Sequence, residues 1–67
     1  MTKAVAIREM RGGEKVTHRF FHPGEWIRMN MYSDAVYDEL DHQLRDFWKH
    51  REGPQWQRGW SLYTDPE

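Results

Sequence analysis

Residues 33–60, SDAVYDELDHQLRDFWKHREGPQWQRGW, contain the pattern on which the fold prediction depends. Six apolar side chains recur there at spacings of one, three and four residues, as they do along one side of an α-helix. They are Val36, Tyr37, Leu40, Leu44, Phe47 and Trp48. A Ser-Asp pair precedes the first of them and can cap the first helical turn. Gly53 and Pro54 can end the helix, so the pattern predicts one amphipathic helix over residues 34–52.

The beginning of this helix is open to a second interpretation. Residues 35–39 can instead be extended and pair with residues 26–30, and the helix then begins near Asp41. Element boundaries depend on the weakest signals in a sequence, so the pattern leaves both interpretations open.

Alternating segments predict strands in the rest of the chain. The expected strands cover residues 3–10, 15–21, 26–31 and 60–63. The pair Gly12-Gly13 is expected to form a hairpin turn between the first two, because glycine adopts positive φ without penalty. Pro23 ends the second strand because it cannot donate a backbone hydrogen bond. We therefore expect a single small α+β domain over residues 1–67, in which one amphipathic α-helix packs on an antiparallel sheet of three to four strands.

The composition indicates a small core that is filled by a few large side chains. Only 37% of the 67 residues are hydrophobic, yet 15% are aromatic and four are Trp. An aromatic side chain buries on the order of 150–250 Å². A domain of this size gains little stability from its own core, so a partner or a second copy would add to it.

No feature of the sequence is typical of a secreted or membrane protein. The chain has no Cys, which removes disulfides and thiolate metal sites. No apolar run approaches the ~20 residues of a membrane span, and the N-terminus lacks the apolar region of a signal peptide. We expect a cytoplasmic protein without a membrane partner.

The polar side chains form no motif that is typical of catalysis or metal binding. Four of them would share one side of the predicted helix, namely Asp38, His42, Asp46 and His50. Carboxylates and imidazoles at this spacing suit a transition metal, and His18 and His22 could add ligands from a second element. However, the stripe lies opposite the apolar stripe and is expected to face water. Since there is no Cys nucleophile and no glycine pattern around the serines, we expect no enzyme, no metal and no cofactor.

The Trp and Arg side chains near the C-terminus are the best candidates for a partner-binding surface. Trp60 precedes an alternating run and is expected to plug the end of the core. Trp56 lies between two glutamines and is expected to anchor a partner together with Arg58, because Trp and Arg dominate binding hot spots. Arg45 and Lys49, on the predicted helix, belong to the same candidate set.

The C-terminal half of the chain resembles short accessory proteins that tailed phages and prophages encode. The resemblance consists of an aromatic pattern, Asp46-Phe47-Trp48, then Arg51, then Trp56, then Gly59-Trp60. The upstream run at 36–39 is also similar, although a glycine turn usually follows it in those proteins and Leu40-Asp41-His42 follows it here. The resemblance implies a protein that acts in the cytoplasm of a bacterial host, and it implies no activity.

These observations favour a non-enzymatic protein-binding module that modulates a host protein. A second hypothesis is a small protein that binds single-stranded nucleic acid through its aromatic rings together with Arg45, Lys49 and Arg58. The net charge of −1 argues against it, because proteins that contact phosphates usually carry a basic surplus. A third hypothesis is a subunit of a homo-oligomeric structural assembly.

Overall fold

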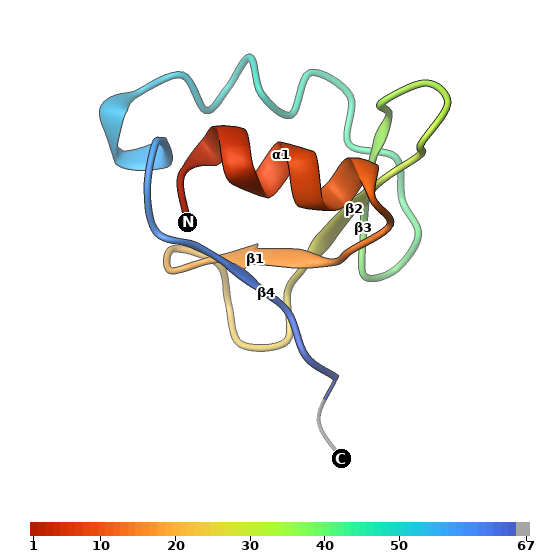
Figure 1. The fold of residues 1–67 in the computed structure, drawn as a ribbon, viewed down its shortest axis with the longest axis horizontal. Coiled ribbons are helices and arrows are strands. Elements are labelled where there is room, and N and C mark those ends of the chain that lie inside the picture. Colours follow the sequence, from red (N-terminus) through yellow and green to blue (C-terminus); the bar gives the residue numbers. More distant parts are fainter. Residues whose placement is uncertain (66–67) are drawn as a thin grey trace.

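A four-stranded antiparallel sheet with one α-helix packed across it forms the fold (Figure 1). The computed structural model describes residues 1–65. Its elements are α1 (Lys3–Arg11), β1 (Val16–His18), β2 (Ile27–Met29), β3 (Val36–Asp38), the short 3-10 helix η1 (Pro54–Trp56) and β4 (Trp60–Leu62). The strand order across the sheet is β3-β2-β1-β4. The predicted α+β class is confirmed, although the helix lies elsewhere in the chain than expected.

The helix α1 occupies the segment for which the sequence predicted a strand. The hydroxyl of Thr2 accepts a hydrogen bond from the backbone N–H of Val5, and this caps its first turn. Ala6 and Met10, which are four residues apart, are buried against the sheet. The alternation that predicted a strand over residues 3–10 was therefore misleading, because the residues that face the core follow the helical period.

The pair Gly12-Gly13 ends this helix, so the predicted hairpin turn is wrong. The N–H of Gly12 donates to the carbonyls of Arg8 and Glu9 at 3.2 and 3.0 Å. Gly13 has a φ of +96°, a value that L-residues rarely adopt, and this turns the chain toward β1.

The register of the sheet places one set of side chains on the core side. Val16 on β1 lies opposite both Ile27 on β2 and Leu62 on β4, and His18 lies opposite Trp60. The strands predicted over residues 15–21, 26–31 and 60–63 are confirmed in shorter form. The alternative interpretation of residues 35–39 is confirmed as well, since β3 pairs with β2 along its whole length.

The predicted helix over residues 34–52 does not exist, and neither does the shorter version from Asp41. After β3 this part of the chain is a series of turns. Asp34, Asp41 and Asp46 have φ values of 59°, 64° and 56°, and each interrupts the right-handed helical path. Moreover, the carboxylate of Asp38 accepts hydrogen bonds from the backbone N–H groups of Leu40 and His42, both at 2.9 Å. Such local bonds compete with helix formation.

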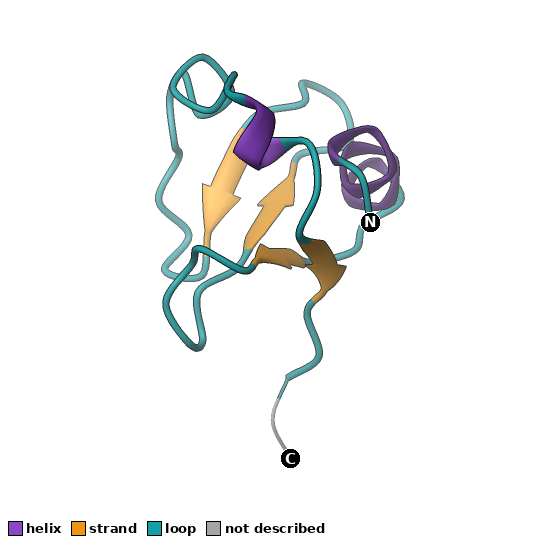
Figure 2. Cartoon of the chain, turned by 90° about the vertical axis from the view of Figure 1, so that its left-hand side faces the viewer, coloured by secondary structure: helices purple, strands orange, loops and turns teal. Residues whose placement is uncertain are grey.

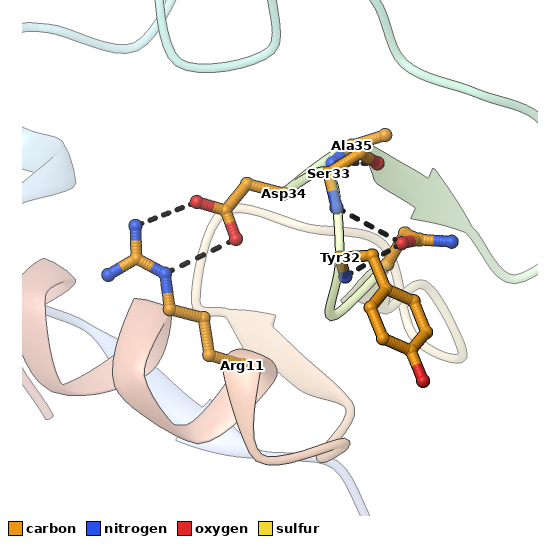
Figure 3. A network of polar contacts seen from close by, with 6 residues as sticks. Arg11, Tyr32, Ser33, Asp34 and Ala35 are labelled. Atoms are coloured by element: carbon orange, nitrogen blue, oxygen red, sulfur yellow. Dashed lines mark hydrogen bonds and ion pairs between the residues drawn. The ribbon is translucent and has the colours of Figure 1, made fainter.

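The turn between β2 and β3 is tied to the end of α1 (Figure 3). The guanidinium of Arg11 donates to both carboxylate oxygens of Asp34, from Nε at 3.3 Å and from Nη2 at 2.8 Å. In the same turn, the side-chain oxygen of Asn30 accepts hydrogen bonds from the N–H groups of Tyr32 and Ser33. The hydrogen bond to the Asp34 carboxylate and the charge of that carboxylate raise the pKa of Arg11.

The core lies between the sheet and a cover made of α1 and residues 44–56. Its buried apolar residues are Ala6, Met10, Val16, Ile27, Met29, Val36, Phe47 and Trp60. Phe47 is buried as predicted, and Leu44 and Trp48 are partly buried against this cluster. Leu40 was predicted to be buried, but its side chain is 68% exposed because it sits in the turn after β3. In Figure 2, α1 and η1 lie on the same side of the curved sheet, which leaves the other face without a helix.

A pair of substitutions distinguishes this fold from the one with a helix over residues 34–52. Met10→Ala should reduce the free energy of unfolding by about 2–5 kcal/mol, because Met10 is fully buried and its loss leaves a cavity. Leu40→Ala should change it by less than about 0.5 kcal/mol, as surface substitutions usually do. Thermal or urea unfolding measures both values. A strongly destabilising Leu40→Ala combined with a neutral Met10→Ala would contradict the position of α1.

Candidate functional site

The side chain of His18, at the end of β1, is the centre of an aromatic cluster. It is only 2% exposed, and four rings surround it. The distances between ring centroids are 4.5 Å to Trp56, 4.7 Å to Trp60, 5.1 Å to Phe20 and 6.0 Å to Phe21. The imidazole therefore lies in the middle of the aromatic rings at this end of the sheet.

Both ring nitrogens of His18 bind backbone groups of neighbouring segments. Nδ1 accepts a hydrogen bond from the N–H of Phe20 at 3.1 Å, so Nδ1 carries no proton. The proton is then on Nε2, which donates to the carbonyl of Arg58 at 2.7 Å. This neutral tautomer satisfies two backbone groups that would otherwise lack a partner.

Gly59 allows the chain to pass close to His18. Its φ of +90° lies in the region that favours glycine. A Cβ atom at this position would lie 3.0 Å from Nε2 of His18 and 3.1 Å from the side chain of Arg19. A larger residue would therefore push the segment that contains Arg58 away from the imidazole.

The two C-terminal tryptophans lie in this cluster at different depths. Trp60 is buried, as the sequence predicts for a plug, and its Nε1 donates to the carbonyl of Trp56 at 2.7 Å. Trp56 is partly buried, because η1 lays its ring against His18 and Trp60. The sequence predicted an exposed Trp56, but only part of its side chain is exposed.

The exposed surface of the cluster is formed by Phe20 and the free edge of Trp56. The side chain of Phe20 is 56% exposed, and its ring meets Trp56 edge-on, with centroids 5.6 Å apart and an interplanar angle of 88°. The guanidinium of Arg19 lies 5.2 Å from the centroid of Phe20. Arg58 is exposed, and its own backbone carbonyl is the one that His18 binds. We call Arg19, Phe20, Trp56 and Arg58 the aromatic corner.

Arg51 lies between the aromatic corner and the core. Its guanidinium is 4.0 Å from the ring centroid of Phe47 and 5.2 Å from that of Trp56, and it donates to the carbonyl of Phe47 at 3.2 Å. Its Nε is buried and has no hydrogen-bond partner among the described residues. Burial lowers the pKa of Arg51, whereas the charge of Glu25 acts in the opposite direction. The stacking on two rings holds the cation in place, and it limits the movement of Trp56.

The other two predicted partner-binding residues line a separate hollow. Arg45 and Lys49 border an open depression of about 310 Å³ that also includes Asp34, Asp46 and Trp48. Trp56 and Arg58 do not line this depression. A smaller cavity of about 130 Å³ lies beside Arg51, and its lining is Phe21, Glu25, Ile27, Asp38, Leu44, Phe47 and Arg51.

The predicted stripe of carboxylates and imidazoles is dispersed because its helix is absent. Asp38 and His42 remain close, with Oδ2 and Nδ1 3.6 Å apart, but they belong to one turn. Within residues 1–65, no group of three or more His, Asp or Glu side chains could hold a metal ion. In the same part of the chain, no helix is long and apolar enough to cross a membrane.

Two members of the aromatic corner, Arg19 and Phe20, were not predicted from the sequence. The signal was the pair Phe20-Phe21, which is separated from Pro23 by a single residue. Adjacent residues in an extended segment point to opposite sides, so one phenylalanine of such a pair must face outward. No protein-family model, curated protein or solved structure matches the chain, so its function is argued from its own residues.

Replacement of the central histidine tests this arrangement. His18→Ala should reduce the free energy of unfolding by at least ~2 kcal/mol, because it leaves the N–H of Phe20 and the carbonyl of Arg58 without partners. The matched control is His22→Ala, which removes an exposed imidazole four residues away and should be nearly neutral. Urea unfolding gives both values. In addition, ¹⁵N NMR of the imidazole should show the proton on Nε2, and a proton on Nδ1 would contradict the assigned bonds.

Proposed function

We propose that this chain is a non-enzymatic protein-binding module that uses the aromatic corner to hold another protein. The observation that carries the proposal is the phenyl ring of Phe20, which is more than half exposed while it rests edge-on against Trp56. The guanidinium of Arg19 lies 5.2 Å from the centroid of the Phe20 ring, and Arg58 is exposed in the segment whose carbonyl binds His18. Aromatic and Arg side chains are the groups that contribute most to binding hot spots.

The backbone around the aromatic corner is fixed before any partner arrives. The N–H of Arg19 donates to the carbonyl of Gly59 at 3.0 Å, and the N–H of Phe21 donates to the backbone carbonyl of His18 at 2.9 Å. From α1, the N–H of Lys3 donates to the carbonyl of Gln57 at 2.9 Å. Since the segments that carry the corner are held on both sides, little conformational entropy is lost on binding.

The charges of the aromatic corner define the kind of partner that it fits. Arg19 and Arg58 favour a surface that places carboxylates around an apolar side chain, because guanidinium groups bind carboxylates in bidentate fashion. The partner we propose is a protein of a bacterial host, following the resemblance of the C-terminal half to short phage and prophage proteins. Arg45 and Lys49 line a different hollow, so we propose no role for them in the same contact.

Substitutions at the exposed positions test the proposal. A tagged wild-type protein should capture a specific protein from bacterial lysate, with or without nuclease treatment. Phe20→Ala and Arg58→Ala should each weaken that binding by ~2 kcal/mol and leave the melting temperature unchanged. Trp56→Ala should both weaken binding and lower the melting temperature, because its ring packs against His18 and Trp60.

Matched controls exist elsewhere on the surface. Leu40→Ala also removes an exposed apolar side chain, and Arg45→Ala removes an exposed guanidinium, and both should bind as the wild type does. Capture that persists in the Phe20→Ala, Arg58→Ala double variant would refute the role of the aromatic corner. If the mass in solution rises with concentration and this rise is lost in the same double variant, the corner joins copies of the chain instead.

A further inference from the structure

The sheet face opposite α1 carries a second set of aromatic and cationic side chains. Alternation along the strands determines its members, because Val16, Ile27 and Trp60 face the core and their neighbours in sequence face the other way. The side chains of this open face include Lys15, Thr17, Trp26, Arg28, Tyr37, Ser61 and Tyr63. The register agrees, since Arg28 lies directly opposite Tyr37 and Thr17 lies directly opposite Ser61.

Three rings and two cations on the open face form two groups. The ammonium of Lys15 lies 4.5 Å from the centroid of the Trp26 ring, and the ring of Tyr63 lies 6.1 Å from Trp26 at an interplanar angle of 33°. Across β2 and β3, the guanidinium of Arg28 lies 4.6 Å from the centroid of Tyr37. These rings are partly exposed. Among residues 1–65, both helical segments lie on the other side of the sheet (Figure 2).

The chemistry of the open face suits one class of partner in particular. Rings and cations are prominent among these side chains. Such residues also occur at protein interfaces, but rings next to cations on an open sheet face offer both stacking surfaces and phosphate contacts, as nucleotides require. Each base can stack on a ring, and each phosphate can meet an ammonium or guanidinium. We propose that the open face binds single-stranded nucleic acid, with bases on Trp26, Tyr37 and Tyr63 and phosphates at Lys15 and Arg28.

A single strand fits this face better than a duplex. In a duplex the flat faces of the bases stack on each other and are not available to aromatic side chains, whereas a single strand can spread its bases over a surface. Aromatic residues on the open face of a four-stranded sheet can stack two or three bases. This surface is separate from the aromatic corner, and the proposal does not depend on the one made for that corner.

The carboxylates near the open face lie at its margins. Asp65, after the end of β4, is 3.0 Å from the Nζ of Lys15, and Asp41, in the turn after β3, pairs with Arg28. Both carboxylates are largely exposed, and exposed ion pairs are weak. A phosphate can therefore replace either carboxylate as the partner of its cation. This arrangement also reconciles a phosphate-binding face with a net charge of −1, since the carboxylates compete with the ligand rather than block the rings.

Fluorescence anisotropy with a labelled oligothymidylate at low salt tests the proposal. The wild type should bind the single strand more tightly than a duplex of equal length. Trp26→Leu and Tyr37→Leu, which keep an apolar side chain but remove the flat ring, should each weaken binding by about tenfold. Phe20→Ala, which removes an exposed ring from the aromatic corner, should leave it unchanged. Melting temperatures show which variants are folded, and only folded variants enter the comparison.

Removal of the competing carboxylates should strengthen the binding of the oligonucleotide. The double variant Asp41→Asn, Asp65→Asn should bind the oligonucleotide several-fold more tightly. Asn tolerates the positive φ of residue 41, so the turn should persist. The matched control is Asp46→Asn, Glu52→Gln, which changes the net charge by the same amount away from the open face and should bind as the wild type does.

Each of several outcomes would overturn the proposal. They are equal tightening in both double variants, equal weakening by Phe20→Ala and Trp26→Leu, and no binding of the oligonucleotide by the folded wild type. Binding of an acidic polyglutamate peptide as tight as that of the oligonucleotide would also overturn it, because the face would then recognise charge without bases. The aromatic corner is tested with other residues and another ligand, so failure of one proposal leaves the other intact.

Discussion

The shape of one end of this molecule depends on the two hydrogen bonds of the His18 imidazole. Nδ1 determines the direction in which the chain leaves β1, because it holds the N–H of Phe20. Nε2 holds the carbonyl of Arg58 and thereby fixes the segment that leads into β4. Only glycine at position 59 allows this close approach. The exposed position of Phe20 is therefore a consequence of a constrained backbone rather than of a free loop.

The strands could be predicted from the sequence because turn residues bound them, whereas the helix could not. Gly59 directly precedes β4, and Pro23 lies in the turn between β1 and β2, so both strands could be placed although β1 ends earlier than expected. The residues of α1 that face the sheet are Ala6 and Met10, and neither is conspicuous beside Val5 and Ile7. The small side chain of Ala6 is what permits a helix to lie close to the sheet, and a hydrophobicity pattern gives little weight to it.

Residues 34–52 form no α-helix, and the spacing of their apolar residues does not reveal why. Three Asp residues adopt left-handed φ values, and Asp38 binds the N–H groups of the turn that follows it. An Asp in a helix and an Asp in such a turn look the same in the sequence, so tertiary context decides between them. Phe47 reaches the core all the same, because a turn can deliver a large side chain to a small core as well as a helix can.

In the candidate site, the burial of single residues could be predicted from the sequence, but the grouping of residues into one surface could not. Trp60 had to be buried because the strand that it begins lies next to β1, and the sequence indicated this strand. The set of Trp56, Arg58, Arg45 and Lys49 assumed a helix that would bring the cations near the arm, and without it the set divides into two surfaces. Whether Phe20 or its neighbour faces outward depends on the end of β1, and alternation alone does not fix that point.

The open face of the sheet raises the question of why rings should lie there at all. With a single helix and a short chain, only one face can be covered, and the other must stabilise its strands while in contact with water. Cross-strand pairs of aromatic, cationic and hydroxyl residues meet that need, so the presence of Tyr37 opposite Arg28 has a structural reason in itself. The stability of the sheet does not explain the positions of the charged side chains, however, because an exposed ion pair adds little stability at any position. On this face Lys15 and Arg28 each lie against a ring, whereas their carboxylate partners, Asp65 and Asp41, lie in the segments that follow β4 and β3. Cations that can contact phosphates therefore lie next to rings on which bases can stack. Binding of a single-stranded nucleic acid requires this arrangement.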